Sequence, residues 1–196
     1  MPGPVIVGIT GASGALMARA MVDELLRRDM ATAVVCSGAA RMVWQEELGY
    51  SFNETLVEWQ EHPAFVHYGI SDLRAPIASG SYPAAGMALV PASMNSIASL
   101  ANGISNNLLL RAADVCLKER RPLTLVPRET PLHSIHLENM LTLSRMGAVI
   151  LPPDPAFYLQ PRSLDDVARY VVGKVLVALG IDRELPADLQ YGERPA

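Results

Sequence analysis

The stretch Val5-Ile-Val-Gly-Ile-Thr-Gly-Ala-Ser-Gly14 decides the fold of this 196-residue chain. Its first five residues form a short, β-branched run with the length of a buried strand, and glycines follow at once. From Ala15 to Arg28, apolar residues then recur at helical spacing. A strand that passes through a glycine turn into a helix is the opening unit of an α/β domain.

The same alternation continues along the chain. Further strands are expected at 32–36, 87–90, 123–126 and 148–151, and further helices at 38–48, 107–119, 134–146 and 163–180. The helix at 107–119 is apolar on nearly all sides and is expected to be buried. Residues 50–78 are less regular and leave room for one more strand. The pattern predicts one three-layer α/β domain over residues 1–196, with a mostly parallel sheet covered on both faces.

Composition excludes several classes of function. Charged residues make up 18% of the chain, against about 25% in an average soluble domain, and apolar residues make up 50%. The net charge is −4, without a basic run or an apolar stretch long enough to span a membrane, so neither nucleic-acid binding nor a membrane span is expected. Two cysteines and no signal-peptide pattern favour a cytoplasmic protein. The apolar surplus suggests burial between subunits of a homo-oligomer.

The glycine turn after the first strand predicts an anion site. Ligands of parallel α/β sheets bind at the carboxyl ends of the strands, and a helix N-terminus offers N–H groups to a phosphate. The second strand ends in Cys36-Ser37, without the acidic residue that holds a dinucleotide ribose. A mononucleotide such as FMN therefore suits the turn better than NAD. The alternative is a tight turn without a ligand.

Two other segments carry candidate binding groups. Small polar residues at Ser93–Ser96 begin a helix after the strand at 87–90; taken alone, such a start is more often a simple N-cap. Cations cluster farther along, at Arg111, Lys118, Arg120, Arg121 and Arg128. Arg111 and Lys118 are seven residues apart and share a helix face. They suit an anionic substrate or, alternatively, a network of salt bridges between subunits.

Other chemistry finds little support. His133, His136 and Glu138 lack a matching third set of ligands, so no metal site is predicted. Cys36 and Cys116 lie inside apolar runs and are interpreted as core residues. Glu47 is, by position alone, a solvated residue of the helix after Ser37.

Several motifs resemble those of one family. They are Gly8-Ile-Thr-Gly-Ala-Ser-Gly14, Ala78-Ser-Gly-Ser81, Arg111-Ala-Ala-Asp-Val115, Leu117-Lys-Glu-Arg-Arg-Pro122, Val126-Pro-Arg-Glu-Thr-Pro-Leu132, His136-Leu-Glu-Asn-Met140, Gly147-Ala-Val-Ile150 and Ala156-Phe-Tyr158. Their order and spacing resemble the flavin prenyltransferase (UbiX-like) family, formerly described as phenolic acid or 3-octaprenyl-4-hydroxybenzoate decarboxylases. The resemblance covers nearly the whole chain.

The resemblance implies a Rossmann-like (flavodoxin-like) domain that assembles into dodecamers, with the tail 181–196 in subunit contacts. It implies that reduced FMN and dimethylallyl phosphate are the substrates. The dimethylallyl group is joined to flavin N5 and C6, and the prenylated FMN passes to a partner decarboxylase. No metal is implied, and whether the donor is the monophosphate or the pyrophosphate stays open.

The resemblance also assigns roles to individual residues. The implied FMN contacts are Gly11, Ala12, Ser13, Ser37, Ser93, Met94, Asn95, Ser96 and Arg128. For the prenyl donor, Tyr158 and Lys174 are implied to hold the phosphate with Arg111 and Lys118 nearby, and Ser79 is implied to line the prenyl pocket. The implied catalytic residues are Glu47, Ser13, Lys118, Arg128 and Glu129. In these roles, Glu47 lies near flavin N5 and Glu129 is the acid beside the departing phosphate. Leu73 departs from the pattern, because some members carry Trp there.

Two other functions remain as alternatives. The Pro91-Ala-Ser-Met-Asn95 turn resembles that of FMN-dependent decarboxylases of the phosphopantothenoylcysteine and peptidyl-cysteine type. A non-catalytic FMN-binding accessory subunit is the other alternative. The Arg128-Glu-Thr-Pro131 run and the pair Tyr158 and Lys174 favour the prenyltransferase over the decarboxylase. The cations Arg111, Lys118 and Lys174 argue against an accessory subunit, because FMN alone does not need them all.

Overall fold

A computed structural model describes residues 3–192 of the chain. The strands are β1 (Val5–Ile9), β2 (Thr32–Cys36), β3 (Phe65–Tyr68), β4 (Gly86–Ala92), β5 (Leu123–Pro127) and β6 (Val149–Ile150). The α-helices are α1 (Ala15–Arg27), α2 (Gly38–Leu48), α3 (Phe52–Gln60), α4 (Met94–Ala101), α5 (Leu108–Lys118), α6 (Ser134–Arg145) and α7 (Leu164–Ala178). Short 3₁₀ turns are η1 (Pro76–Ala78), η2 (Phe157–Leu159) and η3 (Ala187–Leu189).

The six strands form one sheet in the order β3-β2-β1-β4-β5-β6, and every neighbouring pair is parallel. This order is that of the doubly wound Rossmann arrangement, in which the chain reverses direction across the sheet between β1 and β4. The predicted α/β class and parallel sheet are confirmed. Because all strands run the same way, the loops that follow them share one edge of the sheet, the edge where ligands bind in such folds.

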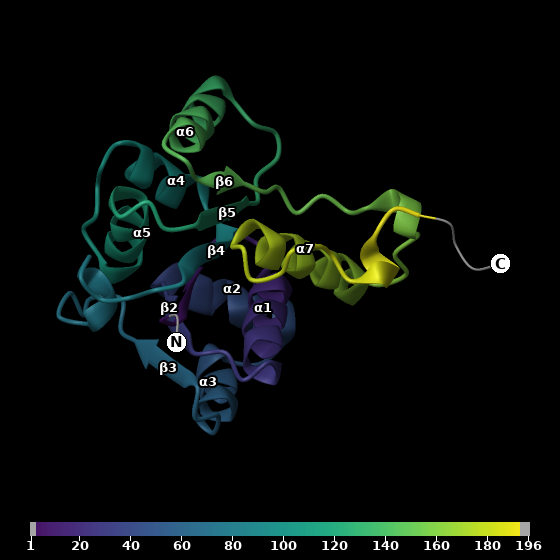
Figure 1. Cartoon of the computed structure of the whole chain (residues 1–196), viewed down its shortest axis with the longest axis horizontal. Coiled ribbons are helices and arrows are strands. Elements are labelled where there is room, and N and C mark those ends of the chain that lie inside the picture. The colour runs from purple at the N-terminus through teal and green to yellow at the C-terminus, as the bar shows by residue number, and fades with distance from the viewer. Residues whose placement is uncertain (1–2, 193–196) are drawn as a thin grey trace.

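Helices cover both faces of the sheet and enclose two separate cores (Figure 1). One core joins α1, α2, α3 and α7 to side chains such as Val5, Val7 and Ile9 of β1. The other joins α4, α5 and α6 to the opposite face, through residues such as Ile6 and Leu89. Successive residues of β1 point to opposite faces, so both cores draw on the same buried strand.

The segment 50–78 contains more structure than its sequence pattern indicated. The one further strand for which the sequence left room is β3. The segment also contains α3, a helix that was not expected. The side chain of Ser51 accepts a hydrogen bond from the Glu54 N–H, and the Glu54 carboxylate accepts one from the Ser51 N–H. This capping box was one available signal, because Ser-x-x-Glu commonly begins a helix.

Helix α5 corrects a second expectation. Its buried side includes Leu109, Ala113 and Cys116, but Arg111 and Asp114 are half-buried and Lys118 is exposed. The helix is therefore amphipathic rather than buried on all sides, because its charged residues recur along one face. The capping box at Ser163 and the end of the last helix at Gly180, which has φ +72°, are as expected.

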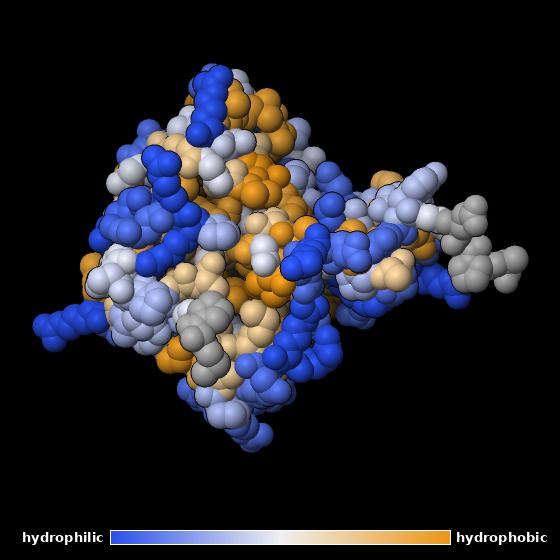
Figure 2. Space-filling model, viewed as in Figure 1, coloured by the Kyte–Doolittle hydropathy of each residue, from blue (hydrophilic) through white to orange (hydrophobic). Residues whose placement is uncertain are grey.

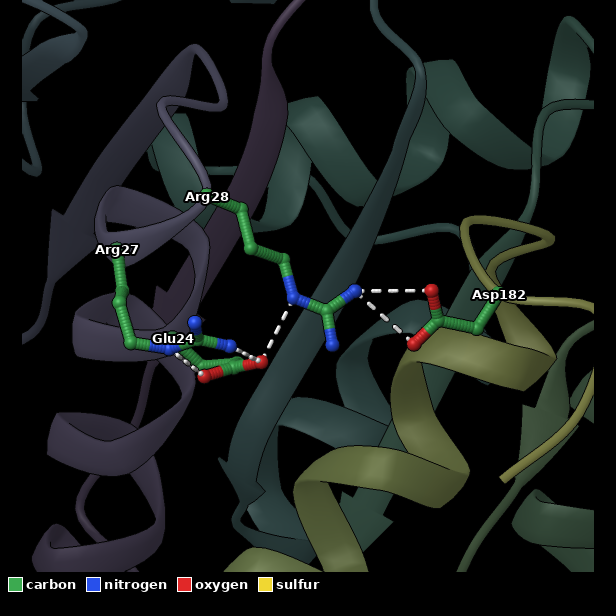
Figure 3. A network of polar contacts seen from close by, with 4 residues as sticks. All are labelled: Glu24, Arg27, Arg28 and Asp182. Carbon is green, nitrogen blue, oxygen red and sulfur yellow. Dashed lines mark hydrogen bonds and ion pairs between the residues drawn. The ribbon is translucent and has the colours of Figure 1, made fainter. Parts of the chain in front are cut away.

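Beyond β6, helix α7 packs on α1, whereas the segment before it, with η2, and the segment after it, with η3, form an arm that projects from the body of the molecule (Figure 1). Its return segment is tied to α1: Arg28 donates to both carboxylate oxygens of Asp182 at 2.8 and 3.0 Å, and also to Glu24 at 2.7 Å (Figure 3). The described part of the predicted interface tail thus contacts its own chain. Residues 193–196 of that tail lie outside the described residues.

Two further properties concern the described residues 3–192. None of their helices combines the length and apolar character that crossing a bilayer requires. They also contain no group of three or more His, Cys, Asp or Glu side chains arranged to hold a metal ion. His133, one of the histidines considered above, caps α6 by accepting a hydrogen bond from the His136 N–H.

Candidate active site

The turn between β1 and α1 is held against the end of β4. The Thr10 hydroxyl donates to the Pro91 carbonyl at 2.7 Å and accepts from the Ser93 N–H at 2.7 Å. Gly11 must be glycine, because a Cβ there would lie 2.4 Å from the Cβ of Ala39 at the start of α2. Gly14 has φ +123°, a conformation that L side chains rarely adopt. The glycines therefore bring three strand ends close together.

A cavity of about 660 Å³ opens beside this turn, and we call it the carboxyl-edge pocket. Its volume lies within the range of small-molecule sites, roughly 300–1,000 Å³. It lies against the ends of β5 and β6 and the first turns of α1 and α7. Its lining consists of Ser13, Gly14, Leu16, Met17, Glu47, Leu48, Pro127, Arg128, Glu129, Thr130, Pro152, Pro153, Asp154, Leu164, Val167 and Ala168.

Four of the predicted catalytic residues meet in this pocket: Ser13, Glu47, Arg128 and Glu129. They come from three separate segments, which the topology brings to one edge. Asp154 also lines the pocket and was not singled out from the sequence. The rule that ligands bind after strand ends pointed to its segment, but a lone Asp between prolines gave no further signal.

Glu47 is exposed, as its position alone predicts, but its carboxylate is held by the backbone. Its carboxylate accepts hydrogen bonds from the N–H of Gly14 at 2.9 Å and of Ala15 at 2.8 Å, so it occupies the N-terminus of α1. Burial opposes ionisation, but hydrogen bonds from Ser13 and these two N–H groups, with the charge of Arg128, hold the pKa of Glu47 below its ordinary value. Glu47 is therefore ionised at neutral pH.

This arrangement corrects one expectation about the glycine turn. The N–H groups of α1 were expected to be free for a phosphate, but Gly14 and Ala15 donate theirs to Glu47. The earlier N–H groups of the turn, those of Gly11, Ala12 and Ser13, have no hydrogen-bond partner among residues 3–192. The N–H groups left to bind an anion are therefore those of the glycine turn, and not those at the start of α1.

The predicted serine contacts act as helix caps in this structure. The Ser37 side chain accepts from the Ala40 N–H at 3.1 Å and begins α2. The Ser93 hydroxyl accepts from the Ser96 N–H at 3.3 Å and lies 3.0 Å from the Ser96 hydroxyl. Capping and ligand binding are compatible, because both caps lie at the carboxyl edge of the sheet. Met94 is buried beside them, and Asn95 is exposed.

Three predicted prenyl-phosphate residues form a separate group, which we call the α5 cluster: Ser79, Arg111 and Lys118. The Arg111 guanidinium donates to the Ala78 carbonyl at 3.1 Å and to Asp114 at 2.7 Å. Lys118 forms an ion pair with Glu119 beside Gly80. Arg111 and Lys118 share a helix face, as predicted, but none of the three lines the carboxyl-edge pocket.

Of the remaining two predicted residues, Tyr158 lies on the projecting arm and Lys174 is an exposed residue of α7. Tyr158 belongs to η2 and is 40% exposed, and its ring meets that of Tyr191 edge-on at 5.2 Å. The hydroxyl of Tyr170 raises the pKa of the Tyr158 phenol, while the nearby charge of Lys174 opposes this rise. Tyr158 and Lys174 are thus close to each other, but neither lines the carboxyl-edge pocket. Within one chain, the predicted site residues therefore lie in three separate places: at the carboxyl edge of the sheet, in the α5 cluster, and around Tyr158 and Lys174.

Both cysteines are buried, in agreement with their interpretation as core residues. Burial raises the pKa of the Cys36 thiol to about 12 and that of Cys116 to about 11. Both thiols therefore stay protonated at neutral pH and are poor nucleophiles. Leu73, where some members of the family carry Trp, is 52% exposed and packs into neither core.

The fold and this pocket together define a class. A doubly wound parallel sheet, with a glycine turn and a pocket of acids, a cation and apolar walls at its carboxyl edge, is a mononucleotide-binding α/β protein. A family model described as Flavoprotein matches residues 2–176. The class is therefore a flavin-binding one.

Curated relatives identify the family more closely. The flavin prenyltransferase UbiX of Alkalihalophilus pseudofirmus is 47% identical, covering 91% of this chain and 92% of that protein. The flavin prenyltransferase UbiX of Methanocaldococcus jannaschii is 42% identical, covering 92% of this chain and 95% of that protein. The chain belongs to the flavin prenyltransferase family, which confirms the resemblance found in its sequence.

Solved structures agree. The structure titled AnUbiX (PadA1) in complex with FMN and dimethylallyl pyrophosphate is 37% identical, with full coverage of both chains and a TM-score of 0.89. A dodecameric FMN-dependent UbiX-like decarboxylase from Escherichia coli O157:H7 is 42% identical, with a TM-score of 0.84, covering 90% of this chain and 94% of that one. The peptidyl-cysteine decarboxylase EpiD shares the fold, at 20% identity and a TM-score of 0.58.

Proposed function

We propose that this protein joins the dimethylallyl group of dimethylallyl phosphate to N5 and C6 of reduced FMN. One observation carries the proposal: in a chain of this family, an ionised Glu47, Ser13, Arg128 and Glu129 converge on one pocket at the carboxyl edge. The curated relatives bear the name of this activity, and a solved relative binds FMN and dimethylallyl pyrophosphate.

The residues at the carboxyl edge suit FMN. The unpartnered N–H groups of the glycine turn and the guanidinium of Arg128 would hold its phosphate, because both are strong donors to anions. Apolar side chains such as Leu48, Met17 and Pro152 give a surface for a flat ring. Ser37 and Ser93–Ser96 would contact FMN from the neighbouring strand ends. When bound, reduced FMN supplies the nucleophilic atoms N5 and C6.

Charge decides the roles proposed for the pocket residues. Breaking an allylic C–O bond produces a phosphate anion and an allyl cation. Arg128 stabilises the developing anion, and Glu129 protonates the departing phosphate. Glu47 is ionised, so it serves as a proton acceptor at N5, and Ser13, which donates a hydrogen bond to Glu47, orients its carboxylate. Apolar walls exclude the water that would otherwise capture the cation.

The other five residues are proposed to reach the pocket from neighbouring copies of the chain. Within one chain, the α5 cluster, Tyr158 of the arm and Lys174 of α7 do not line the pocket, and the arm projects outward (Figure 1). A homo-oligomer, such as the dodecamer of the Escherichia coli relative, brings these surfaces together. Arg111, Lys118 and Lys174 would then bind the prenyl phosphate, Tyr158 would donate a hydrogen bond to it, and Ser79 would line the prenyl pocket.

Anaerobic incubation with reduced FMN tests the proposal. With dimethylallyl phosphate or its pyrophosphate, mass spectrometry should find a flavin that has gained a five-carbon unit. FMN binding without any gain in mass would overturn the proposal and would support the accessory-subunit alternative. Release of CO₂ from a cysteine-containing peptide, again without prenylation, would support the decarboxylase alternative.

The surroundings of the reaction follow from the same proposal. A partner decarboxylase uses the product, prenylated FMN, and this chain itself does not catalyse the decarboxylation. A cytoplasmic location agrees with a reduced pair of buried cysteines. Co-purification of the product with a decarboxylase that becomes active on receiving it would support this step.

A further inference from the structure

A second cavity lies at the opposite end of the sheet from the carboxyl-edge pocket. It has a volume of about 750 Å³ and adjoins the amino ends of β5 and β6 and the last turns of α5, α6 and α7. We call it the arginine pocket. Its lining consists of Leu117, Arg120, Arg121, Pro122, Leu123, Arg145, Met146, Gly147, Val149 and Ala178. None of the site residues assigned above belongs to it.

Every charged residue of this lining is an arginine. Arg121 is fixed by a hydrogen bond of 2.6 Å to the Gly80 carbonyl. Arg120 and Arg145 are exposed, and neither forms an ion pair with an acidic group within residues 3–192. Most other arginines that line pockets in this acidic protein face carboxylates, as Arg27, Arg28 and Arg169 do. Arg121 also lies near the Glu119 carboxylate, whose pKa is lowered by Lys118 and further by the charge of Arg121. Arg120 and Arg145, the cations of this lining without an ion-pair partner in residues 3–192, are therefore the ones that favour an anion.

The backbone at Arg120 is unusual in a way that supports this reading. Arg120 has φ +56° and directly follows the C-cap of α5, the position where glycine is usual. A left-handed conformation costs a non-glycine residue about 1–2 kcal/mol. The N–H of Arg121 closes the turn by donating to the Cys116 carbonyl at 2.8 Å. A cationic side chain therefore occupies a backbone position at which glycine, without a side chain, is the favoured residue.

The helix ends do not cancel this charge. Cations are often placed at helix C-termini because each end carries about half a negative charge, and the ends of α5, α6 and α7 border the pocket. Three guanidinium groups exceed three half charges by about one and a half units. The last carbonyls are also engaged: the Arg120 N–H donates to Leu117, and the Met146 N–H donates to Leu143. The pocket therefore keeps a net positive charge.

The rest of the lining is apolar. Leu117, Met146 and Val149 contribute side chains to it, and Met146 and Val149 are 53% and 40% exposed. On the face seen in Figure 2, hydrophobic residues gather between α6 and α7, with hydrophilic residues around them. Inorganic phosphate alone would leave this surface in contact with water. An apolar group attached to the anion would cover it.

We propose that the arginine pocket is a second ligand site, which binds a phosphate or carboxylate group carried on an apolar body. Arg120 and Arg145 pair with the anion, Arg121 borders it, and the apolar body lies on Leu117, Met146 and Val149. The length of β5 separates this ligand from the carboxyl-edge pocket, because the two cavities lie at opposite ends of that strand.

Titration of the FMN-loaded protein with phenyl phosphate tests the proposal. The double variant Arg120→Asn, Arg145→Gln should weaken binding at the arginine pocket by about tenfold or more, because two charge-assisted contacts are lost. Asn is chosen at position 120 because it tolerates a positive φ. Benzoate in place of phenyl phosphate separates a carboxylate preference from a phosphate one, and inorganic phosphate should bind more weakly than either.

Three further experiments make the result decisive. The charge-matched double variant Arg74→Gln, Arg183→Gln should leave binding unchanged, because these exposed residues lie outside the pocket. Arg128→Gln should leave this second binding event in place, which separates it from the proposed prenyl transfer. Crystals soaked in selenate should show anomalous density between Arg120 and Arg145. Equal binding by the pocket variant and its control, or density only in the carboxyl-edge pocket, would overturn the proposal.

Discussion

The carboxyl-edge pocket and the C-terminal arm differ in how much of their bonding is completed within one chain. In the pocket, Glu47 is fixed by two N–H groups of α1, and the turn beside it is tied to β4 through Thr10. On the arm, Phe157 and Tyr191 are 79% and 84% exposed. The pocket is therefore a built site, whereas the arm presents a surface that a second copy of the chain would cover.

The largest expected effect tests the pocket side of this comparison. Glu47→Gln keeps the shape of the side chain but removes its charge, so proton acceptance at N5 is lost. Turnover should fall by about 100-fold or more, the range typical of a lost general base. FMN affinity should change little, because Glu47 binds the backbone of α1. Single-turnover kinetics and FMN titration measure the two quantities, and unchanged turnover would remove Glu47 from the mechanism.

The next effect tests the α5 cluster. Lys118→Met keeps the apolar stem and removes the ammonium group that is proposed to bind the prenyl phosphate. The KM for dimethylallyl phosphate should rise about tenfold or more, because a charge-assisted contact is lost. FMN affinity should stay the same, and Arg74→Gln provides the exposed-cation control. An unchanged KM would leave Lys118 with only its ion pair to Glu119.

A smaller effect concerns pH. The pKa of Glu47 is lower in the folded chain than its ordinary value of 4.5, so folding is favoured by its ionised form. This contribution to stability is fully present above about pH 4.5 and is lost as the pH falls through the folded pKa. Urea denaturation should show the wild type more stable than Glu47→Gln at pH 7, with the difference shrinking toward pH 3. A difference independent of pH would contradict this.

The smallest effect tests what holds the arm to the body. Arg28 and Asp182 form an ion pair in which one guanidinium nitrogen, Nη1, donates to both carboxylate oxygens, and each side chain is 25% exposed (Figure 3). Asp182→Asn should lower the free energy of unfolding by about 0.5–1 kcal/mol, as expected for a partly exposed ion pair. Asp29→Asn is a suitable control because that carboxylate is 91% exposed. Equal effects of the two substitutions would show that the Arg28 pair does not fix the arm.

Periodicity made most of the fold predictable. β1, β2 and α2 begin and end at the expected residues because buried strands and capped helices leave clear patterns. Helix α3 was missed because it is only nine residues long, although Phe52, Leu56 and Trp59 stand at helical spacing. Its capping box was the second local signal. The short β6 pairs with β5 at only two residues, so its expected range of 148–151 is too long.

The site was predictable by position but not by arrangement. Motif resemblance selected Ser13, Glu47, Arg128 and Glu129, and the chain brings these four together. That Glu47 caps α1 depends on how α2 packs beside the glycine turn, which no local pattern records. Nor does the sequence show that the α5 cluster and the arm lie outside the pocket, because this follows from the path of the chain around the sheet.

Mixed oligomers test the central claim most directly, namely that one reaction uses residues from more than one copy of the chain. Glu47→Gln and Lys118→Met chains, co-expressed with different tags and purified through both, should regain about a quarter of the wild-type rate at dimethylallyl phosphate concentrations below the KM, because roughly one shared site in four of a randomly mixed oligomer is intact. A mixed site can hold an intact Glu47 from one chain and an intact Lys118 from another. Activity no higher than the average of the two separate variants would contradict the shared site.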